Sequence, residues 1–297
     1  MKAALVLALL VAGCSSAPGN GYGAGGTWDG GAGSDGSSAD AGDASLDDAG
    51  DASLDGSIAD AADAAWSCDP ATYPLPNEGL MEAPGQGGCS LGMLRVDTFC
   101  VDRFEASLEL ITPVGGVTSW SPYENPGSTP VRAVSIEGAV PQAYINADQA
   151  EAACQAAGKH LCTDTEWLRA CQGAAGNTYP YGNTRIPGVC NDARSEHPII
   201  ELFGMDASFT SDELNDPCVD QLPDSLDLCG ANAQCVSADG LYDMMGNLHE
   251  WTSDPAGTFR GGYYVDTVIN GQGCLYVTTA HNRSYWDYST GFRCCTG

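Results

Sequence analysis

The segment DGLYDMMGNLHEWTSD, residues 239–254, concentrates side chains that could do chemistry. It holds the carboxylates Asp243 and Glu250, and the Gly246–Asn247 pair between them is typical of a tight turn. A turn can bring backbone carbonyls and carboxylates to one point, and calcium binds about six to eight such oxygens. The segment therefore fits either a calcium loop or a turn that Asp243 and Asn247 only stabilise, with Glu250 capping a neighbouring backbone.

The cysteines are the second group of residues that could take part in chemistry. Of the 14 cysteines, 13 follow Cys14, and together with an export signal this number predicts disulfides formed in an oxidising compartment. Because 13 is odd, at least one cysteine is free, metal-bound or paired between chains. Cys154, Cys162 and Cys171 do not form CxxC pairs, so a zinc ribbon is not expected. The spacing leaves the pairing open.

The first residues, MKAALVLALLVAGCSS, predict an export signal. The apolar run at residues 3–12 has the length of a secretory signal core and is too short to span a membrane. The ending LVAGC resembles the bacterial lipobox, which implies that Cys14 is lipidated and heads the mature chain. A plain secretory signal is the alternative. A lipid would anchor the chain to a membrane, and Ser15 implies, by resemblance to bacterial lipoproteins, the outer membrane of the cell envelope.

Residues 15–66 are predicted to be a disordered tether between this lipid and a folded domain. They contain 10 Asp and no Lys or Arg, and the repeat DAGDASLD occurs twice between Asp40 and Asp55. Too few apolar groups are present to offset the entropy of ordering the chain, and the like charges extend it. A calcium-binding repeat array is disfavoured because the Gly-rich nonapeptide pattern is missing.

Residues 67–297 have the length of one domain or at most two. They contain 29 Asp and Glu against 10 Lys and Arg. This excess argues against a nucleic-acid partner, because the phosphate backbone requires clustered cations. The charge is compatible with multivalent cations, with cationic partners or with a soluble acidic surface.

The domain is predicted to be α+β, with two helices packed on a small, mostly antiparallel sheet and long ordered loops. The first helix follows Asn146 as N-cap and stops at Gly158. The second, within residues 163–173, carries a capping box and ends at a glycine. Strands are predicted over residues 98–107 and 130–136, and in the stretches FRGGYYV, CLYVTTAH and GFRCC.

Seven stretches between Thr98 and Cys295 occur in the order of one family pattern: VDRFEAS, PVRAVS, AGKHLCTDTEWLRACQG, YPYGN, GLYDMMGNLHEWTSD, FRGGYY and GFRCC. Each is weakly specific alone, but seven in order are a strong match. In them the chain resembles the formylglycine-generating enzyme, or sulfatase-modifying factor, superfamily. The resemblance implies a modified C-type-lectin-like fold that is poor in regular secondary structure and often binds calcium. Together with the cysteine count, we expect such a domain to be disulfide-rich.

The resemblance also implies a calcium site within DMMGNLHE. Carried over by position, its ligands are the side chains of Asp243 and Glu250 and the backbone carbonyls of Gly246 and Leu248. Asn191, in the stretch CNDAR, falls near a second calcium loop of the family on a loose match. Trp251, next to Glu250, is expected in the core rather than in a binding platform.

For activity, the resemblance implies oxidation of a substrate cysteine by O2 at a copper(I) ion. Two cysteine thiolates hold this ion in the family, and soft thiolates suit it. At the two corresponding positions this sequence has Asp266 and Gly271, and Cys274 lies nearby but out of register. We therefore expect the copper site, and with it the oxidase activity, to be absent.

Two functions stay open. One is a divergent metal-dependent oxidoreductase that uses a reduced Cys274 as its catalytic residue, or an unidentified redox metal near Asp266 and His281. The other is a lectin-like module that binds a glycan or peptide, with calcium as its only metal and Cys274 in a disulfide. Its ligand would be held by long loops and by the aromatic side chains Tyr179, Tyr181, Tyr285 and Trp286. Arg260, Arg283 and Arg293 are expected to pair with carboxylates rather than bind an anion.

Overall fold

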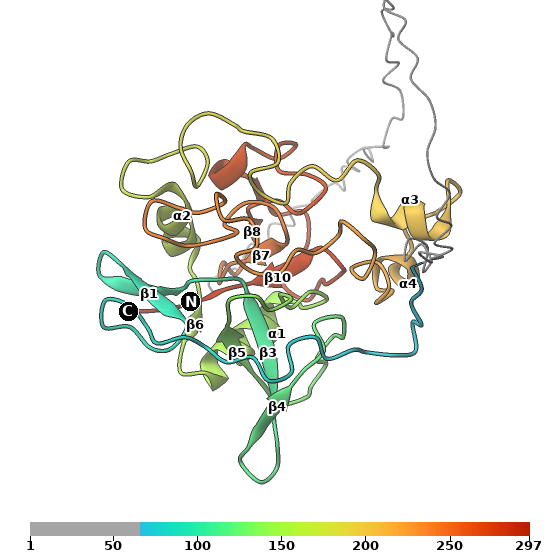
Figure 1. The fold of residues 1–297 in the computed structure, drawn as a ribbon, viewed down its shortest axis with the longest axis horizontal. Coiled ribbons are helices and arrows are strands. Elements are labelled where there is room, and N and C mark those ends of the chain that lie inside the picture. The colour runs from blue at the N-terminus through green and yellow to red at the C-terminus, as the bar shows by residue number, and fades with distance from the viewer. Residues whose placement is uncertain (1–65) are drawn as a thin grey trace, which may run out of the picture. The chain divides into compact units, whose positions relative to one another are not determined.

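The computed structural model describes residues 66–297 (Figure 1). The predicted signal peptide with Cys14, and the predicted tether up to residue 65, lie outside the described residues. Within residues 66–297 no helix combines the length and apolar character needed to cross a bilayer.

The strands of this part of the chain form three small sheets, where the sequence predicted one. The first sheet has the order β1 (Met93–Val96), β2 (Phe99–Asp102), β11 (Cys294–Thr296) and β6 (His160–Leu161). The second has the order β10 (Thr290–Phe292), β7 (His249–Trp251), β8 (Phe259–Arg260) and β9 (Val277–Thr278). The third has the order β4 (Val117–Ser119), β3 (Ala106–Ile111) and β5 (Val131–Ser135).

The pairing is mostly antiparallel, as predicted. Only β10 and β7 pair in parallel among the described strands. The single strand predicted over residues 98–107 is wrong, because residues 103–105 leave the extended conformation and divide it into β2 and β3, which belong to different sheets. This break turns the Glu105 carboxylate inward, where it accepts a hydrogen bond from the backbone N–H of Leu248.

Both predicted helices are confirmed with their caps. Helix α1 (Ala147–Ala156) begins after Asn146, and Gly158 follows it with φ of +73°. Helix α2 (Asp164–Gln172) begins with the predicted capping box of Thr163 and Glu166 and ends at Gly173. Three short elements were not predicted: α3 (Pro198–Phe203), α4 (Ser211–Leu214) and the 3-10 helix η1 (Gly273–Leu275).

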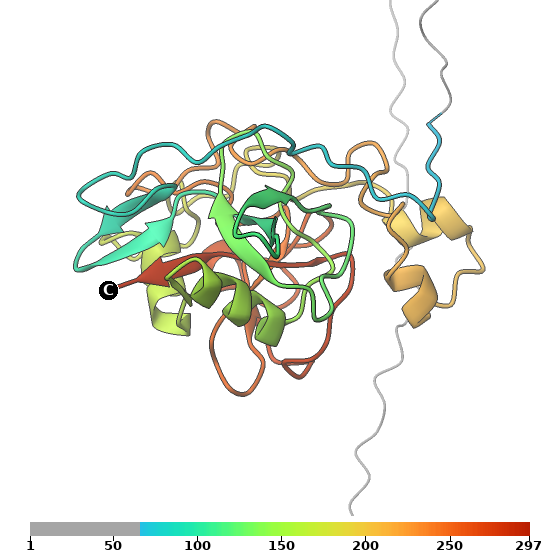
Figure 2. The same ribbon diagram turned by 90° about the horizontal axis from the view of Figure 1, so that it is seen from below.

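The main core lies between α1 and the strands of the second and third sheets. Small side chains on α1, such as Ala150 and Ala153, allow the helix to pack closely against Leu108, Ala133 and Phe292. In Figure 2 the green α1 runs beside the red C-terminal strands, and α1 contacts both β5 and β10. Trp251 is fully buried in the same core, as predicted.

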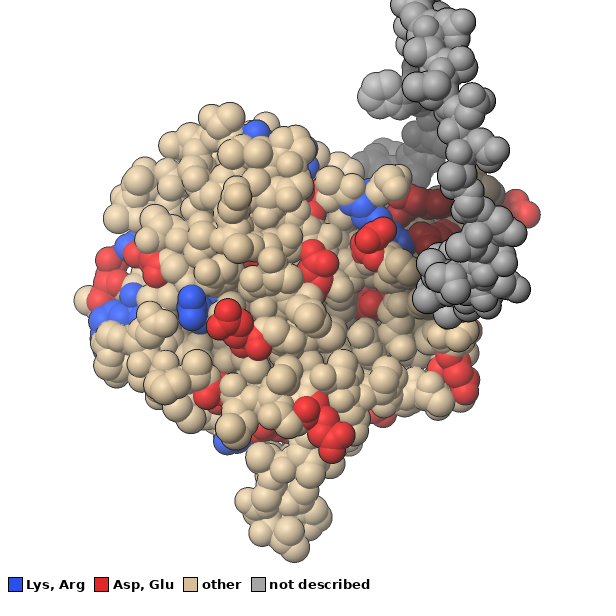
Figure 3. Space-filling view, in the orientation of Figure 1, with Lys and Arg blue, Asp and Glu red and all other residues tan. Residues whose placement is uncertain are grey.

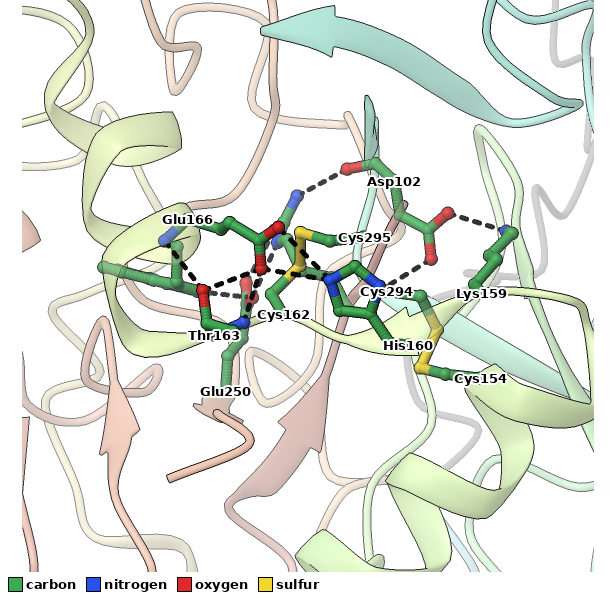
Figure 4. The surroundings of a disulfide bond; sticks show 12 residues. Asp102, Cys154, Lys159, His160, Cys162, Thr163, Glu166, Glu250, Cys294 and Cys295 are labelled. Atoms are coloured by element: carbon green, nitrogen blue, oxygen red, sulfur yellow. Dashed lines mark hydrogen bonds and ion pairs between the residues drawn. A yellow bond between two sulfur atoms is a disulfide. The ribbon is translucent and has the colours of Figure 1, made fainter. Parts of the chain in front are cut away.

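Six disulfides cross-link the described residues, and Cys229 is the one cysteine there without a disulfide partner. The neighbours Cys294 and Cys295 on β11 bond to Cys154 on α1 and to Cys162, which lies just before α2 (Figure 4). The C-terminal strand is therefore tied covalently to both helical segments. The remaining pairs are Cys68–Cys218, Cys89–Cys100, Cys171–Cys274 and Cys190–Cys235.

Two of these disulfides should differ in how much they stabilise the domain. Replacing Cys68 and Cys218 together by Ala should lower the free energy of unfolding by about 5 kcal/mol, and replacing Cys89 and Cys100 by about 3 kcal/mol. The reason is loop length, because the sequence separations are 150 and 11 residues. Urea denaturation of the oxidised proteins measures both losses. A larger loss for the Cys89–Cys100 pair would contradict this expectation.

Candidate functional site

Residues 239–254 form a sharp turn that leads into β7. Asp243, Gly246 and Asn247 all have positive φ, at +55°, +76° and +58°. A Cβ atom on Gly246 would lie 2.1 Å from the carbonyl oxygen of Asn191, so only glycine fits there. Asn tolerates the left-handed conformation better than most residues. The turn predicted at Gly246–Asn247 is therefore confirmed.

The side chain of Asn247 holds this turn to three other segments. Its Nδ2 donates to Oε2 of Glu105 at 2.6 Å and to the carbonyl of Asp227 at 3.2 Å. Its Oδ1 accepts from the backbone N–H of Asp227 at 2.9 Å and from Nδ2 of Asn191 at 3.1 Å. Asn191 and Glu105 therefore belong to the same buried hydrogen-bond network as the turn.

Glu250 and Arg293 form a fully buried ion pair. The side chains are 1% and 0% exposed, and the guanidinium binds both carboxylate oxygens, with Nε to Oε2 at 2.6 Å and Nη2 to Oε1 at 2.6 Å. The indole N–H of Trp167, on α2, donates to the same Oε2 at 2.7 Å. Burial disfavours the charge of Arg293, but Glu250 raises the pKa of the guanidinium above its ordinary value.

Two more acidic groups and a thiol surround this pair. Burial, with help from the neighbouring carboxylates, raises the pKa of Glu105 well above its ordinary value. Burial raises the pKa of Asp243 to about 7, although the N–H of Gly230 and the charge of Arg293 act in the opposite direction. Burial also raises the pKa of the Cys229 thiol. Cys229 is therefore a protonated, enclosed thiol, which is the inert kind.

The four predicted calcium ligands lie in one turn, and three of their carboxylate oxygens accept hydrogen bonds from the protein. Both carboxylate oxygens of Glu250 receive hydrogen bonds from Arg293, and Oδ2 of Asp243 accepts from the backbone N–H of Gly230 at 2.7 Å. Among residues 66–297 no group of three or more His, Cys, Asp and Glu side chains is arranged to hold a metal ion. The predicted calcium site draws on two carboxylates and two backbone carbonyls, Gly246 and Leu248, so it stays a prediction.

The residues at and near the positions of the family's copper ligands, among them Asp266 and Cys274, have structural contacts of their own. Cys274 is fully buried and bonded to Cys171 of α2, so the prediction of a reduced, catalytic Cys274 is wrong for this structure. The carboxylate of Asp266 accepts hydrogen bonds from the backbone N–H groups of Val268 and Ile269, at 2.9 and 3.1 Å, and so stabilises its own turn. These side chains do not fit a copper(I) ion, which needs free thiolates.

Histidines near these positions are packed side chains. The His249 ring is within hydrogen-bond distance of the hydroxyls of Ser289 and Tyr276, at 3.2 and 3.3 Å, and burial lowers its pKa to about 3. His281 stacks on Tyr285 with ring centroids 3.7 Å apart. Asp266 and His281, predicted as an alternative metal pair, thus engage different partners.

The four aromatic side chains predicted to hold a ligand do not form one platform. Tyr179 and Tyr181 stack on each other, with ring centroids 5.7 Å apart. Tyr285 packs against the core beside α1, and Trp286 packs in another cluster that contains Tyr264 and Tyr288. Two hollows, of about 380 and 450 Å³, are lined by other residues.

The arginines pair with carboxylates, as predicted. The ion pairs are Arg260–Asp164, Arg283–Asp148, Arg283–Glu151 and Arg293–Glu250. Figure 3 shows that several basic side chains on the visible face lie directly beside acidic ones. These arginines are therefore not available as an anion site.

Replacing Asn247 should separate hydrogen bonding from backbone strain. We expect Asn247→Ala to lower the free energy of unfolding by about 3 kcal/mol, because it removes the network and forces a side chain with Cβ into positive φ. Asn247→Gly removes the same hydrogen bonds without the strain, so its loss should be about 1 kcal/mol smaller. Urea denaturation measures both. Equal losses would show that the left-handed backbone at residue 247 is not strained.

The comparisons with known proteins agree with this architecture. Residues 110–295 match the sequence model of the sulfatase-modifying factor enzyme 1-like domain. Curated relatives include the inactive C-alpha-formylglycine-generating enzyme 2 of Bos taurus and of Mus musculus, each 27% identical over 169 residues. The match covers 53% of this chain and 50% or 49% of theirs, so the chain spans about half the length of these relatives.

Solved structures that match part of the chain include PvdO from Pseudomonas aeruginosa and CarF. PvdO has a TM-score of 0.40 and 13% identity, and the match covers 67% of this chain and 80% of that chain. CarF has a TM-score of 0.40 and 14% identity, with 67% and 86% covered. The short helices and strands and the six disulfides of residues 66–297 confirm the predicted fold class, α+β and disulfide-rich with little regular structure. Because the family model spans more than half of its residues, the chain belongs to the family of sulfatase-modifying factor enzyme 1-like domains.

Proposed function

We propose that this chain is a lipid-anchored protein of the bacterial cell envelope whose sulfatase-modifying-factor domain binds a ligand and lacks the copper oxidase activity of the formylglycine-generating enzymes. The buried Cys171–Cys274 disulfide is the observation that carries the proposal. It closes the loop that follows β8 with a covalent bond, in the region where an oxidase of this family would need two free thiolates.

The loss of oxidase chemistry has two further supports. The thiolate positions hold Asp266, whose carboxylate is bonded to its own turn, and Gly271. The one unpaired thiol of the described residues, Cys229, is enclosed beside Glu105 and has a raised pKa. The names of the bovine and mouse relatives describe those proteins as inactive, and we carry that property to this chain as part of the proposal.

We propose that two loops, residues 174–190 and 266–282, form the binding surface for an uncharged glycan or peptide. The loops are fixed to each other, because Cys274 N–H donates to the carbonyl of Thr178 at 2.9 Å and Tyr179 OH donates to Gln272 at 3.1 Å. Residues 267–282 contain no Asp, Glu, Lys or Arg, in a chain of net charge −28. They expose aliphatic side chains such as Ile269, which is 80% exposed. A surface depleted in charge and rich in apolar groups is typical of an interface core.

An oxidase assay tests the catalytic half of this proposal. We expect the full chain, incubated with copper(I), O2 and a cysteine-containing peptide, to form no aldehyde, because the two thiolates that hold copper are missing. Peptide mass spectrometry measures the conversion, with an active formylglycine-generating enzyme as positive control. Aldehyde formation by the wild-type chain would overturn the proposal in favour of a divergent metal-dependent oxidoreductase.

The membrane half of the proposal rests on Cys14, so Cys14→Ser should release the protein from the membrane fraction. A diacylglycerol-type anchor, which carries two acyl chains, accounts for attachment without a membrane-spanning helix. Cell fractionation and labelling with a fatty-acid analogue measure the change, and Cys229→Ser serves as the control that keeps the anchor. Unchanged labelling of Cys14→Ser would contradict lipidation at this residue.

A further inference from the structure

Strand β4 forms an edge of the third sheet. It pairs with β3 on one side, and no described strand pairs with it on the other. In an antiparallel pair, residues that exchange backbone hydrogen bonds alternate along the strands with residues that do not. The N–H of Trp120 donates to the carbonyl of Leu108 at 3.1 Å, so the next hydrogen-bonded pair along the ladder is Thr118 with Leu110.

The backbone groups of Val117 and Ser119 therefore face the free edge of β4. These two residues lie on either side of Thr118, opposite Ile111 and Glu109 of β3. They occupy the positions of the ladder that do not exchange hydrogen bonds, where the N–H and the carbonyl point away from the partner strand. The edge thus presents two donors and two acceptors to an incoming strand.

This edge has little of the protection that edge strands usually carry. Proteins protect such edges with charged side chains, prolines, bulges or very short strands. β4 is short, but it contains neither a charged residue nor a proline, and residues 111–123 include no Asp, Glu, Lys or Arg. Val114 and Val117 are 94% and 41% exposed. An uncharged, β-branched edge is the kind to which an extended peptide adds as a further strand.

The hollow of about 380 Å³ adjoins this edge. One wall is a single face of the third sheet, because Ser119 lies opposite Glu109, Ser107 lies opposite Val134, and all four line the hollow. The other wall is residues 77–80, in the segment before β1. Figure 2 shows this blue segment on the side of the green strands that faces away from α1. The hollow is therefore outside the core that α1 covers.

The lining of the hollow suits a small side chain with an apolar part and a hydroxyl. Its aliphatic residues are Leu80, Val117, Val134 and Ile136. Ser119 also lines it, and the Ser119 hydroxyl is buried and has no hydrogen-bond partner within residues 66–297. A buried hydroxyl gains from a partner. The methyl and hydroxyl groups of a threonine side chain match this lining.

Charge selects the kind of chain that docks here. The charged residues that line the hollow are Glu78, which is exposed, and Glu109, which pairs with Arg132. Residues 67–297 carry 29 acidic against 10 basic side chains, so a second copy of the domain would be repelled. The same holds for residues 15–66, with 10 Asp and no Lys or Arg. A basic segment is instead attracted.

We propose that the free edge of β4 docks a basic, extended peptide segment of another protein, which adds to the third sheet as a fourth strand and places a threonine side chain in the hollow beside Ser119. This site shares no residue with the binding surface of residues 174–190 and 266–282. It is therefore independent of the proposed glycan or peptide ligand and of the oxidase activity.

Model peptides test the docking on the full chain. The probe is a fluorescent hexapeptide, Lys-Thr-Val-Thr-Val-Lys with blocked ends, and we expect saturable binding in fluorescence anisotropy. Methylating alternate backbone nitrogens of the peptide removes hydrogen bonds, so we expect about tenfold weaker binding. Glu in place of both Lys should weaken binding similarly, because like charges then meet. No saturation up to about 1 mM peptide, or equal binding of either altered peptide, would overturn the proposal.

A substitution in β4 locates the site. Val117→Pro removes only an outward N–H, which an edge strand tolerates, and we expect about tenfold weaker binding. Val117→Thr keeps the N–H and serves as the matched control with wild-type affinity. In hydrogen exchange, the peptide should protect the amides of Val117 and Ser119 in the wild-type chain.

Two results would contradict the site. One is wild-type affinity of Val117→Pro. The other is a concentration-dependent dimer of the wild-type chain that Val117→Pro abolishes, because the edge would then pair with a second copy. If Val117→Pro does not fold, the peptide series and the exchange pattern of the wild-type chain decide.

Discussion

The ion pair between Glu250 and Arg293 constrains the whole interior of this domain. Removing one partner of a buried pair leaves an uncompensated charge, which costs about 3 to 5 kcal/mol. The surrounding elements must therefore place specific hydrogen-bonding groups beside the pair. The indole N–H of Trp167 on α2 donates to Glu250, and the carbonyl of Asp102 on β2 accepts from Arg293. The capping box at Thr163 fixes where α2 begins, and hence which way Trp167 points. A local sequence signal thus positions a side chain for a contact 83 residues away.

The sequence predicts those parts of the structure that depend on residues close together in the chain. The N-caps Asn146 and Thr163 and the left-handed stops at Gly158 and Gly173 act within one helical turn, and both helices were correct. The strands are only two to six residues long, and many pair with strands far away in the sequence. Such pairing leaves no local sequence signal, so the sequence predicted one sheet where the structure has three. At the site, the Gly246–Asn247 turn was predictable. The sequence analysis did not identify Glu105 as part of the site. A carboxylate within an apolar, strand-like stretch was the signal that could have indicated its buried position.

Membership of a family and the chemistry of a site are separate conclusions. Fold is shared by proteins with different functions, which reside in particular side chains. Here the family's turn, capping box and terminal arginine are present, whereas the side chains at its metal positions have other tasks. Asp266 holds its own turn, Cys274 fastens a loop to α2, and Glu250 is bound to Arg293. Disulfides and a buried ion pair fix the positions of these loops, and preordered loops lose little entropy when a ligand binds.

The adjacent cysteines on β11 have a consequence for the order of events during biogenesis. Their partners, Cys154 and Cys162, lie 140 and 133 residues earlier, so both bonds cannot be in place until the chain has been made through Cys295. Two neighbouring thiols then face two candidate partners, and the exchanged pairing competes with the native one. Thiol–disulfide exchange has to sort these pairings, which makes maturation of this domain slow compared with folding of its helices.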